Sequence, residues 1–151
     1  MTKILFLCHG NICRSPMAEF IMKKLVADAG RAADFAIASA AVSREEIGNP
    51  IYPPAMRTLR QHAIPFDDHR ARQVTAADCA CYDLVICMDQ SNIRLLSRLC
   101  PTASGSGKVH LLMDFAGEHR DVADPWYTGD FATCYEDIVA GCTALLSRFS
   151  N

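Results

Sequence analysis

The sequence predicts an α/β fold built on a parallel sheet with helices on both faces. Short apolar segments alternate with longer segments of helical periodicity, and the connections between them are brief. Such strand–helix alternation produces right-handed βαβ units. No internal repeat, low-complexity tract or linker interrupts the pattern, and 151 residues is an ordinary length for one domain. We therefore expect residues 1–151 to form a single domain.

The first half of the chain supplies two predicted strands and two predicted helices. The continuous apolar run at residues 3–7 is typical of a buried parallel strand. A helix is expected over about 16–29, because apolar residues recur near one face and Gly30 follows as a stop signal. A second strand is expected over 35–40, and a second helix ends near His62.

The second half supplies two further strands and two longer helices. A strand is predicted at 83–88, after which Asp89 can cap a helix that runs to about residue 99. Residues 102–107 should form a flexible loop, and a short strand at 109–112 follows it. A last helix over about 131–149 repeats apolar residues at helical spacing.

Composition and charge exclude several classes of partner. The net charge is −2 and the pI is near 6.2, whereas nucleic-acid and membrane-surface binders usually carry a basic excess. No segment approaches the ~18 apolar residues that span a bilayer, and the first apolar run is too short for a signal peptide. We expect a cytoplasmic protein with neither a nucleic-acid nor a membrane partner.

The eight cysteines are expected to be reduced thiols. Cys87 and Cys142 lie in apolar patterns, where a free cysteine behaves as a small hydrophobe. The spacing Cys79-x-Cys81 is wrong for zinc, and no paired His motif follows. We therefore expect no metal and no cofactor.

The loop after the first strand, residues 8–16, has the features of an anion site. It leads into a helix, so unpaired N–H groups and the positive end of the helix dipole converge there. Gly10 and Asn11 allow the loop to turn its amides inward, and Arg14 can hold two phosphate oxygens at once. A helix N-terminus and a guanidinium both favour a thiolate, so Cys8 is the expected nucleophile. The predicted phosphate-binding residues are His9, Gly10, Asn11, Ile12, Cys13, Arg14 and Ser15.

Two further features carry more than one interpretation. Ser15 precedes Pro16, so its hydroxyl can be a helix cap or a donor to the Cys8 thiolate, and the sequence favours neither. Asp124-Pro125 is by itself a common turn starter. A thiolate nonetheless needs a proton donor to expel an alkoxide or phenolate, and pairing with the Cys8 loop makes Asp124 the expected general acid.

Together these features resemble the low-molecular-weight protein tyrosine phosphatases over almost the whole chain. The matching features are the loop at 8–16 followed by Met17-Ala18-Glu19, Ser39, Gly48, His69-x-Ala71-Arg72-Gln73, Met88-Asp89-x-x-Asn92 and the Asp-Pro-Trp-Tyr segment at 124–127. The resemblance implies a four-stranded parallel sheet. It also implies hydrolysis of phosphotyrosine in protein substrates.

The resemblance further implies roles for individual residues. Cys8 takes the phosphoryl group as a phosphocysteine while Asp124 protonates the leaving oxygen, and Asp124 then activates water. Arg14 and the loop amides hold the phosphate oxygens. The residues expected to hold the loop in shape are Asn11, Ser15, Ser39 and His69. From sequence alone, His69 could equally be a surface histidine at a helix start.

Redox behaviour and substrate choice are also implied. Cys13 matches a family cysteine that forms a disulfide with Cys8 under oxidation, although it could also be only a packing residue.

His9 stands where the family often has an aliphatic or small residue, and residues 43–47 place charge where an aromatic side chain is common. The expected substrate wall consists of His9, Glu45, Tyr52, Trp126 and Tyr127.

Three other functions compete with this interpretation. Thioredoxin-coupled arsenate reductases share the anion loop and add a cysteine relay, for which Cys79, Cys81 and Cys87 are candidates. Those reductases lack the Asp-Pro-aromatic segment, and Cys87 should be buried. Phosphoarginine phosphatases share the fold, but a Thr at the position of Ile12 would mark them. A non-enzymatic phosphate-binding module would need neither a nucleophile nor an acid.

Overall fold

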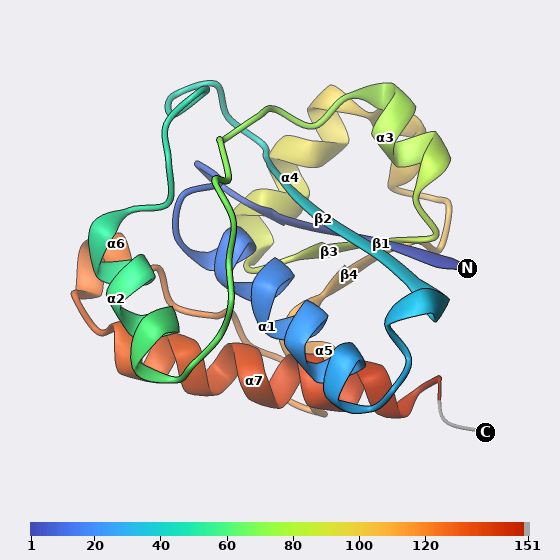
Figure 1. Cartoon of the computed structure of the whole chain (residues 1–151). Coiled ribbons are helices and arrows are strands. Elements are labelled where there is room, and N and C mark those ends of the chain that lie inside the picture. Colours follow the sequence, from blue (N-terminus) through green and yellow to red (C-terminus); the bar gives the residue numbers. More distant parts are fainter. Residues whose placement is uncertain (150–151) are drawn as a thin grey trace.

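A four-stranded parallel sheet forms the centre of the molecule (Figure 1). The computed structural model describes residues 1–149. The strands are β1 (Thr2–Cys8), β2 (Phe35–Ala41), β3 (Leu84–Cys87) and β4 (Val109–Leu111), in the order β2-β1-β3-β4. Every neighbouring pair is parallel. The predicted fold class is confirmed, and no predicted strand end is wrong by more than one residue.

Seven α-helices surround the sheet in residues 1–149. They are α1 (Arg14–Asp28), α2 (Pro53–Gln61), α3 (Ala76–Cys81), α4 (Gln90–Leu99), α5 (Leu112–Phe115), α6 (Pro125–Thr128) and α7 (Phe131–Ser147). Helices α3, α5 and α6 were not predicted, because each spans only four to six residues and has no room for a periodic pattern. Short 3-10 helices at Ala32–Asp34 and Pro101–Ala103 were also missed, and the second of these begins the expected loop.

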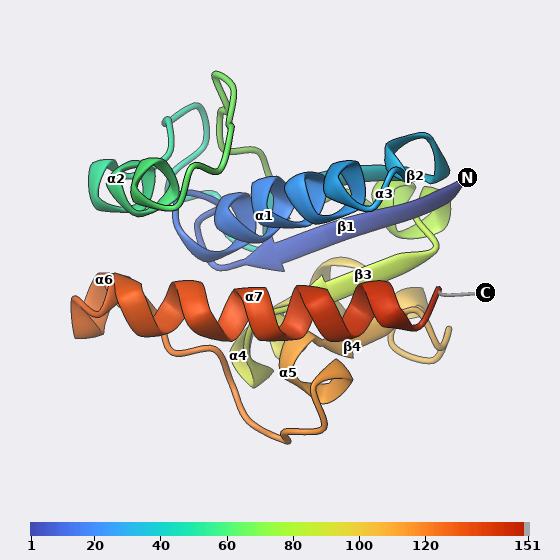
Figure 2. The same ribbon diagram turned by 60° about the horizontal axis from the view of Figure 1, so that its bottom comes forward.

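Alternate residues of the strands face two different helical layers, as a parallel sheet covered on both sides requires. On one face, Ile4 and Phe6 of β1 pack with α1, α2, α5 and α7. On the other, Leu5 and Leu7 pack with α3 and α4. Figure 2 shows α1 and α7 running side by side along the first face. Both layers therefore fix the position of β1, the strand that leads into the predicted site.

Close helix packing explains a glycine inside α7. A Cβ on Gly141 would lie 2.5 Å from Cγ of Leu112 in α5, well inside a normal contact. Glycine normally weakens a helix interior, so its presence here reflects the approach of α5. In residues 1–149, no helix is long and apolar enough to cross a membrane.

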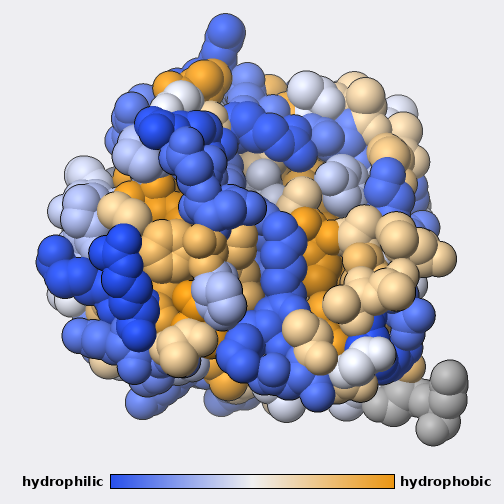
Figure 3. All heavy atoms as spheres, in the orientation of Figure 1, coloured by the Kyte–Doolittle hydropathy of each residue, from blue (hydrophilic) through white to orange (hydrophobic). Residues whose placement is uncertain are grey.

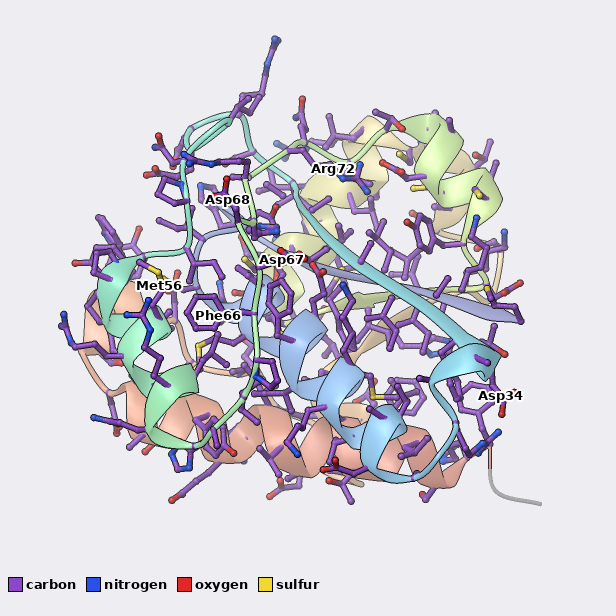
Figure 4. All side chains as sticks on the ribbon, in the orientation of Figure 1. Asp34, Met56, Phe66, Asp67, Asp68 and Arg72 are labelled. Atoms are coloured by element: carbon purple, nitrogen blue, oxygen red, sulfur yellow. The ribbon has the colours of Figure 1, made fainter. Side chains whose placement is uncertain are left out.

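The carboxyl edge of the sheet gathers several loops around the end of β1. The chain leaves β1 toward β2 on one side, and β3 and β4 lie on the other side of β1. Parallel sheets bind ligands at such a reversal of strand order, beyond the carboxyl ends of the strands. The loop after β2 and the segment at 67–73 lie side by side, joined by hydrogen bonds from Gly48 N–H to Ala71 O (2.8 Å) and from Ala71 N–H to Asn49 O (2.9 Å). In Figure 4, Phe66, Asp67 and Asp68 mark where the chain passes over α1 as it enters this segment, and Arg72 lies farther along, beside the end of β2. Figure 3 shows hydrophilic ridges separated by apolar surface on the same face.

Candidate active site

The Cys8 thiol lies at the base of the loop that joins β1 to α1. Cys8 is the last residue of β1 and is only 3% exposed. Its Sγ accepts a hydrogen bond from the Asn11 backbone N–H at 3.2 Å and lies 3.0 Å from Ser15 Oγ. Asn11 has a φ of 62°, a left-handed conformation that asparagine tolerates better than most residues. The loop thus curls back so that one of its amides points at the sulfur.

Ser15 lies within hydrogen-bond distance of the sulfur and does not cap the helix. It lies inside α1, and no side chain caps the first turn of that helix. Asn11 Nδ2 donates to Ser15 Oγ at 2.8 Å, so the serine hydrogen is free to point elsewhere. Cys8 Sγ at 3.0 Å is a nearer acceptor than Ala40 O at 3.4 Å. Of the two interpretations left open by the sequence, the capping one is wrong.

Asn11 is the centre of the predicted loop-support network. It is fully buried, and its Nδ2 donates to both Ser15 Oγ and Ser39 Oγ, the latter at 3.0 Å. His69 Nε2 lies 3.1 Å from both Asn11 O and Asn11 Oδ1. Because both partners are acceptors, this ring nitrogen must carry the proton. His69 lies in the extended segment over α1, with its side chain 9% exposed, so the surface-histidine alternative is wrong.

A buried carboxylate that the sequence analysis missed ends this network. Glu19 of α1 is 7% exposed, and its Oε1 accepts a hydrogen bond from Ser39 Oγ at 2.6 Å. Lys23, one turn later, donates to the other oxygen at 2.6 Å. His69 Nδ1 lies 3.9 Å from Oε1. A glutamate in a helix stretch otherwise filled with buried residues was the available signal, because a buried charge needs specific partners.

Arg14 is held at the start of α1 by two carboxylates that also cap helices. Asp89 caps α4 by accepting from Asn92 N–H through Oδ1, and its Oδ2 accepts from Arg14 Nη1 at 2.7 Å. Asp124 caps α6 by accepting from Trp126 N–H through Oδ1, and its Oδ2 accepts from Arg14 Nη2 at 3.3 Å. The arginine is 2% exposed. Both partners are fixed by their caps, so they orient the guanidinium.

Burial and the neighbouring negative charges shift the pKa of Arg14 in opposite directions. Burial by itself would lower the pKa of the guanidinium, but the negative charges of Cys8, Asp124 and Asp89 outweigh it and raise that pKa. Val122 O adds a further acceptor for Nη1 at 2.9 Å. From the sequence, Asp89 was interpreted as a helix cap and as part of a family-like segment but was given no role in the site, and its contact with Arg14 spans 75 positions of the chain. Its role in the site depends on tertiary structure.

A cleft opens above Cys8, with a void of about 540 Å³ including its open mouth. It is lined by Cys8, His9, Gly10, Ile12, Cys13, Arg14, Glu45, Glu46, Asp124, Trp126 and Tyr127. The three residues that the sequence predicts to be catalytic, Cys8, Arg14 and Asp124, all line this one cleft. Glu46 was not expected. Its Cγ lies 3.2 Å from where a Cβ on Gly10 would stand, so Gly10 provides room for a neighbour and adopts no left-handed geometry.

Four of the five residues expected in the substrate wall line the cleft, and Tyr52 does not. Trp126 is 52% exposed and Tyr127 is 84% exposed, both at the mouth. His9 Nε2 lies 3.0 Å from Glu45 Oε2, and both residues line the cleft. The Tyr52 ring packs against Trp126 with centroids 4.8 Å apart, and both residues line a second hollow.

Comparisons with known proteins agree with this geometry. Residues 3–151 match the family model described as low molecular weight phosphotyrosine protein phosphatase. The chain belongs to this family. It is 39% identical over 149 residues to the human low molecular weight phosphotyrosine protein phosphatase, covering 96% of this chain and 94% of the human one.

Solved structures give the same result. The crystal structure of YfkJ from Bacillus subtilis matches with a TM-score of 0.93 and 37% identity, covering 98% of this chain and 94% of that one. A Drosophila arginine phosphatase matches with a TM-score of 0.88 and 29% identity, covering 99% of both chains. The family resemblance seen in the sequence and the prediction of an enzyme are both confirmed.

The three candidate relay cysteines, Cys79, Cys81 and Cys87, differ in burial and in position. Cys87 is fully buried, as expected, and burial raises the pKa of its thiol. Burial and then the neighbouring Cys100 raise the pKa of Cys79 to about 12. Cys81 lies at the other end of the sheet. In residues 1–149, no group of three or more His, Cys, Asp or Glu side chains could hold a metal ion.

Proposed function

We propose that this enzyme hydrolyses phosphotyrosine monoesters in proteins through a phosphocysteine intermediate. The observation that carries the proposal is the setting of Cys8 Sγ, which accepts a hydrogen bond from a backbone amide and lies 3.0 Å from a serine hydroxyl, beside a buried arginine. The amide donor favours a negatively charged sulfur, and the serine hydroxyl can donate to such a sulfur as well. A sulfur so placed at the floor of an anion site is suited to in-line attack on phosphorus.

The first step transfers the phosphoryl group to the enzyme. The Cys8 thiolate attacks phosphorus, the bond to the tyrosyl oxygen breaks, and its electron pair remains on that oxygen. The Asp124 carboxyl group protonates the oxygen as it leaves. Asp124 lines the same cleft, bonded to Arg14 and next in the chain to the aromatic segment at the mouth, which supports its assignment as the acid for the leaving group.

The second step regenerates the enzyme. Asp124, now a carboxylate, takes a proton from water as the water oxygen attacks phosphorus. The P–S bond breaks, its electron pair returns to Cys8, and inorganic phosphate leaves. Throughout, Arg14 and the amides of residues 9–15 stabilise the equatorial oxygens, with the guanidinium plane fixed by Asp89. No metal or cofactor takes part.

The test is hydrolysis of an aryl phosphate in the presence of EDTA. We expect full activity with the chelator, no detectable turnover in Cys8→Ser, and a loss of about 10²–10⁴-fold in kcat for Asp124→Asn. A trapped phosphoenzyme labelled at Cys8 identifies the intermediate. Turnover that survives Cys8→Ser would overturn the mechanism.

Cys13 is proposed to protect the nucleophile from overoxidation. It lines the same cleft, and burial followed by the charge of Cys8 raises the pKa of its thiol, which keeps it protonated. A Cys8 sulfenic acid would condense with this thiol to a disulfide and water. Inactivation by peroxide should therefore be reversed by thiols in the parent enzyme and irreversible in Cys13→Ser.

Phosphoarginine is a second candidate substrate. Glu45, Glu46 and Asp124 place carboxylates around the cleft, which suits a cationic guanidinium, and one structural neighbour is titled an arginine phosphatase. Ile12 argues for an aryl ring, because it gives the cleft an apolar contact. A kcat/KM for a phosphoarginine peptide that exceeds the value for the matched phosphotyrosine peptide would reverse this order.

We also assign the enzyme to the cytoplasm, with no nucleic-acid or membrane partner. All eight cysteines are free thiols and seven are buried, which suits a reducing compartment. The net charge of −2 gives no electrostatic drive toward nucleic acid. Fractionation of cells that express the tagged chain tests this assignment.

A further inference from the structure

The amino end of the sheet, opposite the catalytic loop, carries an exposed thiol. Cys81 is the exposed member of the eight cysteines, all of which lie within residues 1–149. It ends α3, and its Sγ lies 2.6 Å from Nζ of Lys3 in β1. Sulfur is larger than oxygen, and even N–H···O bonds average about 2.9 Å, so these two atoms are in close contact. Figure 1 shows α3 and the N-terminus at the same end of the sheet.

Lys3 contacts three consecutive residues, Cys81, Tyr82 and Asp83. Its backbone N–H donates to Asp83 Oδ2 and its O accepts from Asp83 N–H, both at 2.8 Å. Its Nζ lies 5.1 Å from the centroid of the Tyr82 ring and donates to Cys81 Sγ. That hydrogen bond raises the pKa of the Lys3 ammonium. The nitrogen and the sulfur are therefore kept together even though both face solvent.

This setting differs from that of the other cysteines. An exposed sulfur next to an ammonium group is a common environment of oxidation-prone thiols. Burial, by contrast, shields Cys87 and Cys142 and raises the pKa of each thiol. An amine already in contact with an oxidised sulfur can attack it before a second oxidant molecule arrives.

We propose that Lys3 and Cys81 form a covalent cross-link in the presence of peroxide. The Cys81 thiolate attacks one peroxide oxygen, the O–O bond breaks, and Cys81 becomes a sulfenic acid. The hydroxide released takes a proton from the Lys3 ammonium and leaves as water. The free Lys3 amine then attacks the sulfur, the S–O bond breaks, and a second water leaves. The product is a sulfenamide, with an S–N bond between the two side chains, in which sulfur is oxidised and peroxide reduced.

A small thiol reverses the cross-link. It attacks the Cys81 sulfur and expels the Lys3 amine, and a second thiol molecule then releases Cys81 from the mixed disulfide. While present, the bond joins β1 to the end of α3 and closes a loop of 78 positions. Cross-links of long loops restrict the unfolded chain and stabilise the fold. The site is therefore a reversible stabilising device that is separate from the catalytic cysteine.

The experiment treats the full chain with equimolar to tenfold hydrogen peroxide and maps peptides by mass spectrometry without reduction. The expected product is a linked pair of peptides containing Lys3 and Cys81, lighter by two hydrogen atoms than the sum of the free peptides. It should persist in Cys8→Ser, which excludes a disulfide to the active-site cysteine. The thermal unfolding midpoint should rise on oxidation and return after addition of a thiol.

Lys3→Arg is the matched control, because it keeps the positive charge and a donor near the sulfur but has no amine to condense. In Lys3→Arg the link should vanish, and a 1,3-diketone probe for sulfenic acid should label Cys81 more strongly than in the parent chain. Equal labelling of Cys81 in both chains, or a parent Cys81 that remains a free thiol after peroxide treatment, would overturn the proposal. Neither outcome bears on the phosphatase mechanism, which does not use these residues.

Discussion

The floor and the walls of the catalytic cleft are built in opposite ways. The floor consists of side chains that are almost wholly buried and joined by hydrogen bonds, among them Asn11, Arg14 and Ser15. The walls consist of side chains that project into solvent, such as Tyr127, which is 84% exposed. Stabilising a transition state requires fixed dipoles, whereas contacts with varied protein substrates require surface. We therefore expect changes in the floor to alter the rate and changes in the walls to alter substrate choice.

The first way to test this contrast is to change the guanidinium of the floor. Arg14→Lys keeps the charge but loses the planar fork held by Asp89 and Asp124. We expect kcat for an aryl phosphate to fall by about 10²–10³-fold. Steady-state kinetics measures this, with Arg98→Lys on the exposed face of α4 as the control. A loss below tenfold would show that the loop amides alone stabilise the transferred phosphoryl group.

The second test separates the two duties of Asp89. Asp89→Asn keeps an oxygen to cap α4 but removes the negative charge that orients Arg14. Hydrogen bonds to charged groups contribute about 1.5–3 kcal/mol, so kcat should fall by about 10- to 100-fold. Asp130→Asn is a matched control, because Asp130 caps α7 by accepting from Thr133 N–H. A fall in the unfolding midpoint with kcat intact would instead show that Asp89 only caps its helix.

The third test changes Ser39, which lies in the hydrogen-bond network of the floor between Asn11 and Glu19. Ser39→Ala removes the hydroxyl that links Asn11 Nδ2 to Glu19 Oε1. A buried polar group left without its partner costs about 1–3 kcal/mol, so the free energy of unfolding should fall by about that amount, and kcat by several-fold. Denaturant unfolding and kinetics measure the two effects. Ser97→Ala, which loses only a local bond to Arg94 O, should stay within about 0.5 kcal/mol of the parent.

The same contrast explains how far the sequence could predict the site. The loop at 8–15 is continuous in the chain, so Cys8, Arg14 and the left-handed Asn11 could be predicted from residue types and spacing alone. Asp124 could be predicted because a thiolate mechanism requires an acid. Fold class followed from periodicity, although helices as short as α6 left no pattern to detect.

Residues that act through tertiary contacts could not be predicted in this way. The Asp89 carboxylate caps a helix with one oxygen, which the sequence indicates, and orients Arg14 with the other, which depends on how α4 packs. The burial of Glu19 depends on the segment that passes over α1. Tyr52 was placed in the wall because it is aromatic and near in sequence, yet its ring packs against Trp126 and does not line the cleft.

The last and smallest expected effect lies in the wall. The Glu45 carboxylate is exposed and bonded to the His9 ring, and Glu46 lies beside it in the cleft lining. These carboxylates should favour phosphotyrosine peptides with a neighbouring Lys over peptides with a neighbouring Glu. Exposed charge pairs contribute about 0.2–1 kcal/mol, so the ratio of kcat/KM between the two peptides should be only a few-fold. It should shrink as salt shortens the Debye length below about 10 Å.

Charge reversal at this position gives the decisive comparison. Glu45→Lys should invert the peptide preference, mainly through KM, because the substituted side chain lies at the mouth and not beside the sulfur. Glu136→Lys makes the same change of net charge on an exposed position of α7 that does not line the cleft. If both variants shift the preference equally, net charge steers the substrate. If only Glu45→Lys does, the wall selects it, as its position in the cleft predicts.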